Sequence, residues 1–308
     1  MKDKRISLEE AIALVPDGCS LTAGGFAHSH QPLGFLRALI AAGRQNLSIM
    51  GVAECWVAEW LAAAGMLDKA WFSNFMFEGF GRCRRFSEGI EAGRIATEDH
   101  SHFGMVMRLV AGAERLPFMP MLSEGGTDIA STAGIERPED KLRIVESPFG
   151  GGERVTVTSP LRPDVAIIHA ARADASGNVQ LDGATAVLEE QAAAARTVIV
   201  TVEEIVEAGE IAANPAATLI PGLYVDALVH LPYGAWPTGM YGYHDPDMDF
   251  LGSYYEASRD PASCTKWIDE HLRGPVDHWD WLDRAGVARL LALRTDPVLG
   301  YRPAEDAA

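Results

Sequence analysis

The chain has 308 residues, 48% of them hydrophobic, which suffices for one large α/β domain or two small ones. A formal net charge of −17 argues against nucleic-acid binding, which needs clustered Lys and Arg, although a small phosphorylated ligand needs only a local basic pocket. No apolar run approaches the roughly 20 residues of a membrane span. The four cysteines show neither CxxC spacing nor a dense framework, so we expect reduced thiols in a cytoplasmic protein.

The most informative stretch of the sequence, residues 17–32, lies in the N-terminal part. A capping box at residues 7–10 predicts a first helix. Residues 17–32 then read as a turn, a short apolar strand, a paired-glycine corner at Gly24 and Gly25, and the start of a helix. Two adjacent glycines remove both Cβ atoms, so backbone N–H groups can approach a ligand oxygen closely at the sheet edge where α/β proteins bind ligands. For an isolated glycine pair, a simple turn is the more economical interpretation.

A second apolar strand is predicted over residues 46–52, so the chain opens with a β-α-β unit on a mostly parallel sheet. Glu54 follows directly. Desolvation raises the pKa of a carboxylate among apolar neighbours and suits it to act as an acid or a nucleophile. A loop glutamate that faces water or caps the next helix is the alternative that its surroundings favour. Glu54 is nevertheless the best nucleophile candidate that this chain itself offers.

An aromatic strand predicted over residues 70–77 leads into three arginines within four residues, Arg82, Arg84 and Arg85. Such a group can clamp a carboxylate or phosphate bidentately, and a solvated basic turn accounts for it equally well. The acidic residues 97–99 predict the start of a helix, because the helix dipole favours negative charge there.

The second half of the chain predicts further strands and helices. Residues 165–169 form a continuous apolar run, which is typical of a strand covered on both faces. An alanine-rich helix is predicted over residues 188–195 and a buried strand over residues 197–202. The aromatic, glycine-rich loop at residues 233–245 suits a partner contact or a pocket wall, or else a surface loop packed by its own rings. We expect a single domain over residues 1–303 and a short disordered tail over residues 304–308.

The whole glycine frame resembles the N-terminal signature of the α subunits of family I coenzyme A transferases: Asp-Gly, an apolar run, Gly24-Gly25-Phe26, then a proline. Residues 84–86, 91–94 and 98–101 look like one subgroup, the α subunit of glutaconate CoA-transferase, and the resemblance spans roughly residues 5–302. Two positions depart from the pattern. Thr22 lies in a run that is usually all apolar, and His30 stands where a glycine is usual, so the loop shape and substrate choice differ from the family pattern here.

The resemblance implies an α/β CoA-transferase-type fold, with a mostly parallel sheet and helices on both faces. It also implies a hetero-oligomer with a β subunit, since in the resembling enzymes the glutamate that forms the acyl-glutamyl anhydride and then the glutamyl-CoA thioester lies on the other subunit. The expected substrates are a small carboxylic acid and an acyl-CoA, with no permanently bound cofactor, metal, nucleic acid or membrane partner. The residues expected to bind substrate or CoA are Gly24, Gly25, Phe26, His28, His30, Arg84 and Arg85.

Two other functions stay open. One is a CoA-thioester or ring-opening hydrolase on the same scaffold; a related hydrolase subunit carries a functional carboxylate near the position of His102, and the histidine here counts against this function. The other is a non-enzymatic or sugar-phosphate-binding module, which similarity through the loops disfavours. Glu124 superficially resembles the nucleophile of the Ser-Glu-Asn-Gly motif in β-type sequences, but the asparagine is missing and we interpret Glu124 as a loop residue.

Overall fold

The computed structural model describes residues 2–296 and 298–302, and the tail expected over residues 304–308 lies outside the described residues. No described helix is long and apolar enough to cross a membrane. The strands are β1 (Ser20–Ala23), β2 (Leu47–Gly51), β3 (Leu67–Phe72), β4 (Met76–Phe77), β5 (Gly81–Arg82), β6 (Ala96–Asp99), β7 (Met119–Met121), β8 (Leu142–Glu146), β9 (Arg154–Thr158), β10 (Val165–Asp174), β11 (Val179–Gln180), β12 (Thr197–Val206), β13 (Thr218–Ile220) and β14 (Ala227–His230).

The helices alternate with these strands and gather at the C-terminal end of the chain. They are α1 (Leu8–Ala13), α2 (Leu33–Ala41), α3 (Cys55–Ala63), α4 (Arg84–Glu91), α5 (His102–Ala113), α6 (Asp128–Ser131), α7 (Pro138–Lys141), α8 (Leu188–Ala194), α9 (Ala208–Ala213), the 3-10 turn η1 (Pro215–Ala217), α10 (Met248–Ala257), α11 (Pro261–Ile268), the π-helical η2 (Asp269–Arg273), α12 (His278–Ala285) and α13 (Val287–Ala292). The expected capping box is present, with Ser7 and Glu10 bonded reciprocally at the start of α1.

The main sheet is mostly parallel, as the sequence predicts. Strands β14, β12, β10, β1, β2, β3 and β6 lie side by side in that order, and every pair of neighbours is parallel. The short strands β11 and β13 continue the sheet from β10 in antiparallel pairing. Because the carboxyl ends of parallel strands share one edge, the residues after β1, β2 and β12 meet there.

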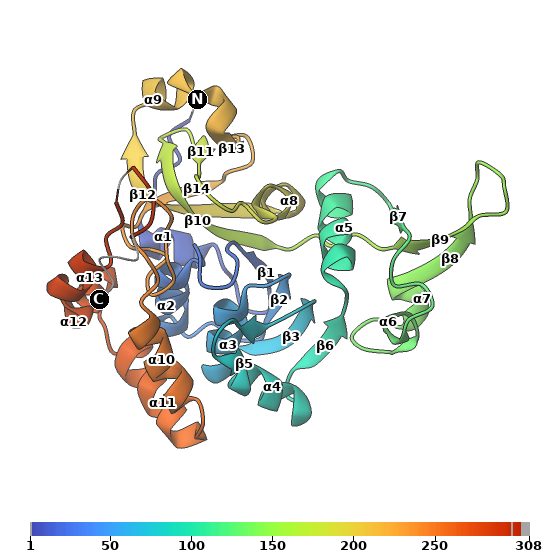
Figure 1. Cartoon of the computed structure of the whole chain (residues 1–308), viewed down its shortest axis with the longest axis horizontal. Coiled ribbons are helices and arrows are strands. Elements are labelled where there is room, and N and C mark those ends of the chain that lie inside the picture. The colour runs from blue at the N-terminus through green and yellow to red at the C-terminus, as the bar shows by residue number, and fades with distance from the viewer. Residues whose placement is uncertain (1, 297, 303–308) are drawn as a thin grey trace.

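Helices cover both faces of this sheet, which confirms the expected α/β architecture (Figure 1). Register sets the two faces: Leu21 pairs with Val165 and points to one face, and Thr22 pairs with Ala166 and points to the other. The first face packs against α1, α2, α3 and the C-terminal helices in the larger apolar core. The second packs against α8 in a smaller core.

Two local expectations are wrong. The strand expected over residues 70–77 is interrupted: β3 ends at Phe72, and β4 pairs with β5 in a separate two-stranded sheet. Residues 97–99 belong to strand β6, which pairs with β3, and the next helix starts only at His102 with Ser101 as its N-cap. The acidic side chain of Glu98 does not serve a helix dipole; it is buried and pairs with Lys141 at 2.5 Å. Lys141 precedes β8, part of a separate three-stranded sheet β7-β9-β8 that extends beyond α5 in Figure 1. A contact distant in sequence therefore decides the conformation of this segment.

Candidate functional site

The glycine corner follows β1 at the carboxyl edge of the sheet. The backbone N–H of Gly24 donates to the carbonyl of Ile167 at 2.8 Å and so continues the pairing with β10. Gly25 has φ +104°, and a Cβ there would lie 2.7 Å from the backbone nitrogen of Gln31. Both the dihedral angle and the close approach require glycine. Gly25 is buried, and its N–H makes no hydrogen bond within the described chain, so it is an unpaired backbone donor at this edge.

The loop after the corner is tied down at several points. Phe26 and Ser29 exchange two backbone hydrogen bonds, and Gly239 exchanges two more with His28 and His30. Two non-glycine residues in this loop, Ala27 at φ +50° and His30 at φ +41°, have left-handed backbone conformations. Such conformations persist only where surrounding contacts determine them, and they cluster at ligand-binding sites. The loop is therefore preformed before any ligand arrives.

The two histidines predicted for the site differ in their surroundings. The ring of His28 has both nitrogens engaged: Nδ1 accepts from Trp56 Nε1 at 2.9 Å, which leaves Nε2–H to donate to the carbonyl of Glu78 at 2.6 Å. His30 is 2% exposed; Ser29 Oγ lies 3.0 Å from its Nδ1, and its Nε2 has no partner in the described chain. Burial lowers the pKa of His30 to about 4, so its imidazole is neutral at pH 7.

Glu54 lies at the N-terminus of α3 but neither faces water nor caps the helix with its side chain. The carboxylate is completely buried. It accepts from the N–H of Ala53 at 2.9 Å and from Gln191 Nε2 at 2.6 Å. Burial raises the pKa of Glu54 to about 7, although the hydrogen bonds from Gln191 and the backbone act to lower it. A nucleophilic role for Glu54 stays a prediction, and it requires that Gln191 first move away.

The two predicted arginines are the first two residues of α4, and both already have protein partners. Arg84 stacks on the ring of Tyr255, with Cζ 3.7 Å from the centroid, and donates to the carbonyl of Tyr255 and to Ser258 Oγ. Arg85 pairs with Glu88 at 2.5 Å, and its Nε has no partner in the described residues. The arginines are thus held in place by their surroundings. Recognition of an acid by either side chain stays a prediction.

A cluster of buried histidines around Glu203 was not predicted. Glu203 Oε1 lies 2.9 Å from His169 Nε2 and 3.7 Å from His244 Nε2, while Oε2 accepts from the N–H of Tyr233 at 2.7 Å. Although burial opposes it, the hydrogen bond from His169 and the nearby ring of His244 lower the pKa of Glu203 to about 2. In the part of the chain that the structure describes, no three or more His, Cys, Asp or Glu side chains are arranged to hold a metal ion.

This cluster ties the aromatic loop at residues 233–245 to the sheet. Tyr233 stacks on His244 at 4.9 Å, and a Cβ at Gly234 would lie 2.6 Å from the His169 ring. His169 ends one predicted buried strand and Glu203 directly follows the other. Polar residues at strand ends are therefore the signal that could have revealed the cluster. Of the two interpretations of this loop, a wall of the edge that carries the glycine corner fits these contacts, because Gly239 of this loop exchanges backbone hydrogen bonds with His28 and His30.

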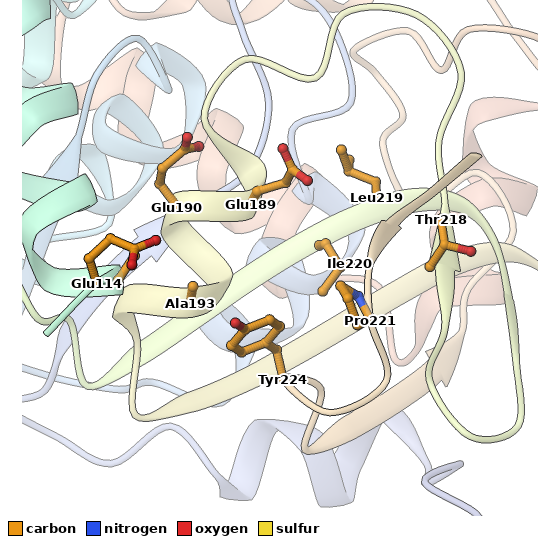
Figure 2. A pocket seen from close by; sticks show the side chains of 10 residues that line it. Glu114, Glu189, Glu190, Ala193, Thr218, Leu219, Ile220, Pro221 and Tyr224 are labelled. Atoms are coloured by element: carbon orange, nitrogen blue, oxygen red, sulfur yellow. The ribbon is translucent and has the colours of Figure 1, made fainter. Parts of the chain in front are cut away.

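Several cavities lie away from the glycine corner, and two of them differ in their lining. Figure 2 shows one of about 350 Å³, lined by the carboxylates Glu114, Glu189 and Glu190 together with Tyr224. Its negative charge disfavours the phosphates of CoA. The other, of about 640 Å³, is a mostly apolar groove between α1, α2 and residues 276–279. Neither is lined by residues 24–30, so we assign neither to the chemistry of the corner.

The chain is similar to known proteins over most of its length. The family model described as coenzyme A transferase matches residues 5–231. The A subunit of glutaconate CoA-transferase from Acidaminococcus fermentans is 33% identical over 97% of both chains. The A subunit of 3-oxoadipate CoA-transferase from Pseudomonas knackmussii is 33% identical over 88% of this chain and 94% of its own.

A solved structure and a more distant relative extend the comparison. The crystal structure of glutaconate coenzyme A-transferase from Acidaminococcus fermentans superposes with a TM-score of 0.91 and 31% identity, over 99% of this chain and 100% of that chain. The cholesterol ring-cleaving hydrolase IpdA subunit of Rhodococcus jostii is only 28% identical, over 90% of this chain and 94% of its own. The chain therefore belongs to the coenzyme A transferase family and is an enzyme subunit similar to the A subunits of that family.

Proposed function

We propose that this chain is the α subunit of a heteromeric CoA-transferase that moves coenzyme A between an acyl-CoA and a small carboxylic acid. Similarity to A subunits over nearly the full length of both chains supports this assignment, and the names of these relatives imply a second chain. The nucleophilic glutamate is then supplied by a β subunit, with the CoA thioester as a substrate and not as a resident cofactor. We place the assembly in the cytoplasm because the spacing of the four cysteines gives no disulfide framework.

The observation that carries the proposal is the contrast between the corner and Glu54. Both groups are buried, but the N–H of Gly25 is unpaired, whereas the carboxylate of Glu54, the best nucleophile candidate in this chain, is bonded to Gln191 and to the N–H of Ala53. A backbone N–H suits the thioester oxygen, on which negative charge develops during attack, and one such donor is typically worth about 10²–10³ in rate. A carboxylate from the partner completes the site.

The proposed chemistry conserves the activated acyl group. The partner carboxylate attacks the thioester carbonyl, the C–S bond breaks, and CoA thiolate leaves from a mixed anhydride. The thiolate then attacks the glutamyl carbonyl of the anhydride, which releases the first acid and leaves a glutamyl-CoA thioester. The incoming acid reverses these two steps, so no net proton or electron is consumed.

We assign pocket-wall roles to Phe26, His28 and His30, and recognition of the acid to Arg84 or Arg85. Replacement of both arginines by alanine is expected to raise the KM for the acid about tenfold or more, because a charge-assisted hydrogen bond contributes about 1.5–3 kcal/mol. The KM for the acyl-CoA is the internal control. An unchanged acid KM in the double variant removes both arginines from this role.

The decisive experiment uses the chain purified with its partner. The complex is incubated with an acyl-CoA, trapped with borohydride or hydroxylamine, and mapped by mass spectrometry. Modification of a partner glutamate supports the proposal, and modification of Glu54 contradicts it. Release of free CoA that does not depend on an acceptor acid supports the hydrolase instead. In this chain His102 is an exposed residue at the start of α5.

A further inference from the structure

A buried amide bridge joins the glycine corner to Glu54. Gln191, on helix α8, is 1% exposed, and its Nε2 donates both to the carbonyl of Ala23 at 2.8 Å and to Glu54 Oε1 at 2.6 Å. Only an amide nitrogen can donate to both oxygens, so the orientation of the side chain is fixed: the opposite orientation would place Gln191 Oε1 against two acceptors. The bridge therefore connects α8, the end of β1 and the start of α3 through one side chain.

The surroundings of the bridge leave little room for movement. A Cβ at Gly51 would lie 2.5 Å from Glu54 Oε2, and a Cβ at Gly24 would lie 2.7 Å from Leu188 Cδ2 on α8. Oε2 of Glu54 also accepts from the N–H of Ala53 at 2.9 Å. Glycines at the ends of both strands thus let the carboxylate and α8 approach closely. Interior packing of this density transmits a displacement of one group to its neighbours.

We propose that Glu54 and Gln191 are positioning residues for the proposed transfer: their bridge holds the Ala23 carbonyl and thereby sets where the N–H of Gly25 points. The inference rests on the proposed function, because the N–H matters only where charge develops on a substrate oxygen. Ala23 is the last residue of β1, two residues before Gly25, so a shift of its peptide rotates the corner directly. A misplacement of about 1 Å can cost about 10² in rate.

Stability alone does not explain a carboxylate at this position. Burial raises the pKa of Glu54 to about 7, and the described chain supplies no cation to offset its charge. Buried ionisable groups with shifted pKa values concentrate at functional sites. The carboxylate also reaches no solvent in the resting chain, which distinguishes a group that orients a neighbour from a group that attacks substrate.

The test compares two buried glutamines in the complex with the partner. Gln191→Leu removes both hydrogen bonds at similar volume. Gln180→Leu is the control, because Gln180 is also buried and its Nε2 also donates to two oxygens, the carbonyls of Ile211 and Asn214; its Oε1 accepts from Arg172, so this variant loses at least as many hydrogen bonds. We expect Gln191→Leu to lower kcat about 10²-fold with the acyl-CoA KM within about threefold, and the control to retain kcat. Equal kcat in the two variants overturns the proposal.

Two further variants keep the proposal falsifiable if Gln191→Leu does not fold. Glu54→Gln retains an oxygen that accepts from Gln191 but turns its NH2 group towards the N–H of Ala53, so kcat is expected to fall, yet to stay within about tenfold of wild type. Gly51→Ala pushes the carboxylate from the opposite side and is expected to lower kcat as Gln191→Leu does. Loss of the trapped intermediate in Glu54→Gln, together with modification of Glu54 in wild type, identifies a nucleophile and overturns the positioning role.

A readout without turnover distinguishes failure of this inference from failure of the proposed function. Hydrogen–deuterium exchange of the amides at residues 24–26 is measured in the resting complex. Faster exchange in Gln191→Leu than in Gln180→Leu supports the bridge even if the wild-type complex transfers CoA to none of the acids tested. Unchanged exchange at residues 24–26 overturns the bridge whether or not the complex is a transferase.

Discussion

Acid is expected to destabilise this protein through His30, a residue of the glycine loop. The ring is 2% exposed, and burial, with a smaller contribution from His169, lowers its pKa from 6.5 to about 4. The unfolded chain therefore binds the proton first. The stability that His30 contributes is fully present above pH 6.5 and is lost as the pH falls towards 4.

The magnitude follows from these two pKa values. Protonation of His30 raises the equilibrium constant for unfolding at pH 5 by a factor of about 30 over its value at alkaline pH, which is about 2 kcal/mol of stability. At pH 7.5 the same effect is about 0.1 kcal/mol. Asparagine is the substitution of choice for His30, because it tolerates the observed φ of +41° and does not titrate. Wild type is expected to lose about 2 kcal/mol relative to His30→Asn between pH 7.5 and pH 5.

The assay is urea unfolding followed by tryptophan fluorescence, at one protein concentration and at half-unit pH steps. His102→Asn serves as the control, because His102 is exposed and its replacement is expected to leave the pH dependence of unfolding parallel to that of wild type. A difference between wild type and His30→Asn that changes by less than about 0.5 kcal/mol over this range refutes the reasoning. It would mean that the ring of His30 is hydrated in solution.

Three further outcomes are expected. Gly25→Ala is expected to lower the free energy of unfolding in urea by about 1–3 kcal/mol more than Gly43→Ala does. Both glycines have positive φ, but only at Gly25 would the new Cβ approach the Gln31 backbone to 2.7 Å. Equal losses in the two variants contradict the close approach. Glu203→Gln is expected to cost about 1.5–3 kcal/mol at pH 7, and this difference shrinks as the pH falls from 4.5 towards the depressed pKa of about 2. A pH-independent difference argues against an ionised Glu203 in the folded chain. Lys141→Met is expected to lower the free energy of unfolding by about 3–5 kcal/mol, because it leaves the carboxylate of Glu98 buried without a counter-charge. A melting temperature equal to that of wild type refutes this.

Short-range sequence patterns predicted the framework of the fold. The strand before the glycine corner, the strand before Glu54 and the two apolar strands of the second half lie where periodicity and turn residues place them. These patterns suffice because a strand or helix is selected by residues a few positions apart. The glycine corner was predictable in the same way, since a positive φ at a sharp turn favours glycine.

Only the tertiary structure decided the surroundings of each side chain. Glu54 looked like a loop residue in water, yet a glutamine 137 residues later in the sequence accompanies it in the core. Residues 97–99 resembled a helix start, yet they pair with β3 as a strand. Burial, hydrogen-bond partners and pKa values depend on contacts between distant segments, which local patterns do not encode. The sequence alone thus determined the elements and the glycine corner, and the folded chain determined which polar groups meet there and in what state of charge.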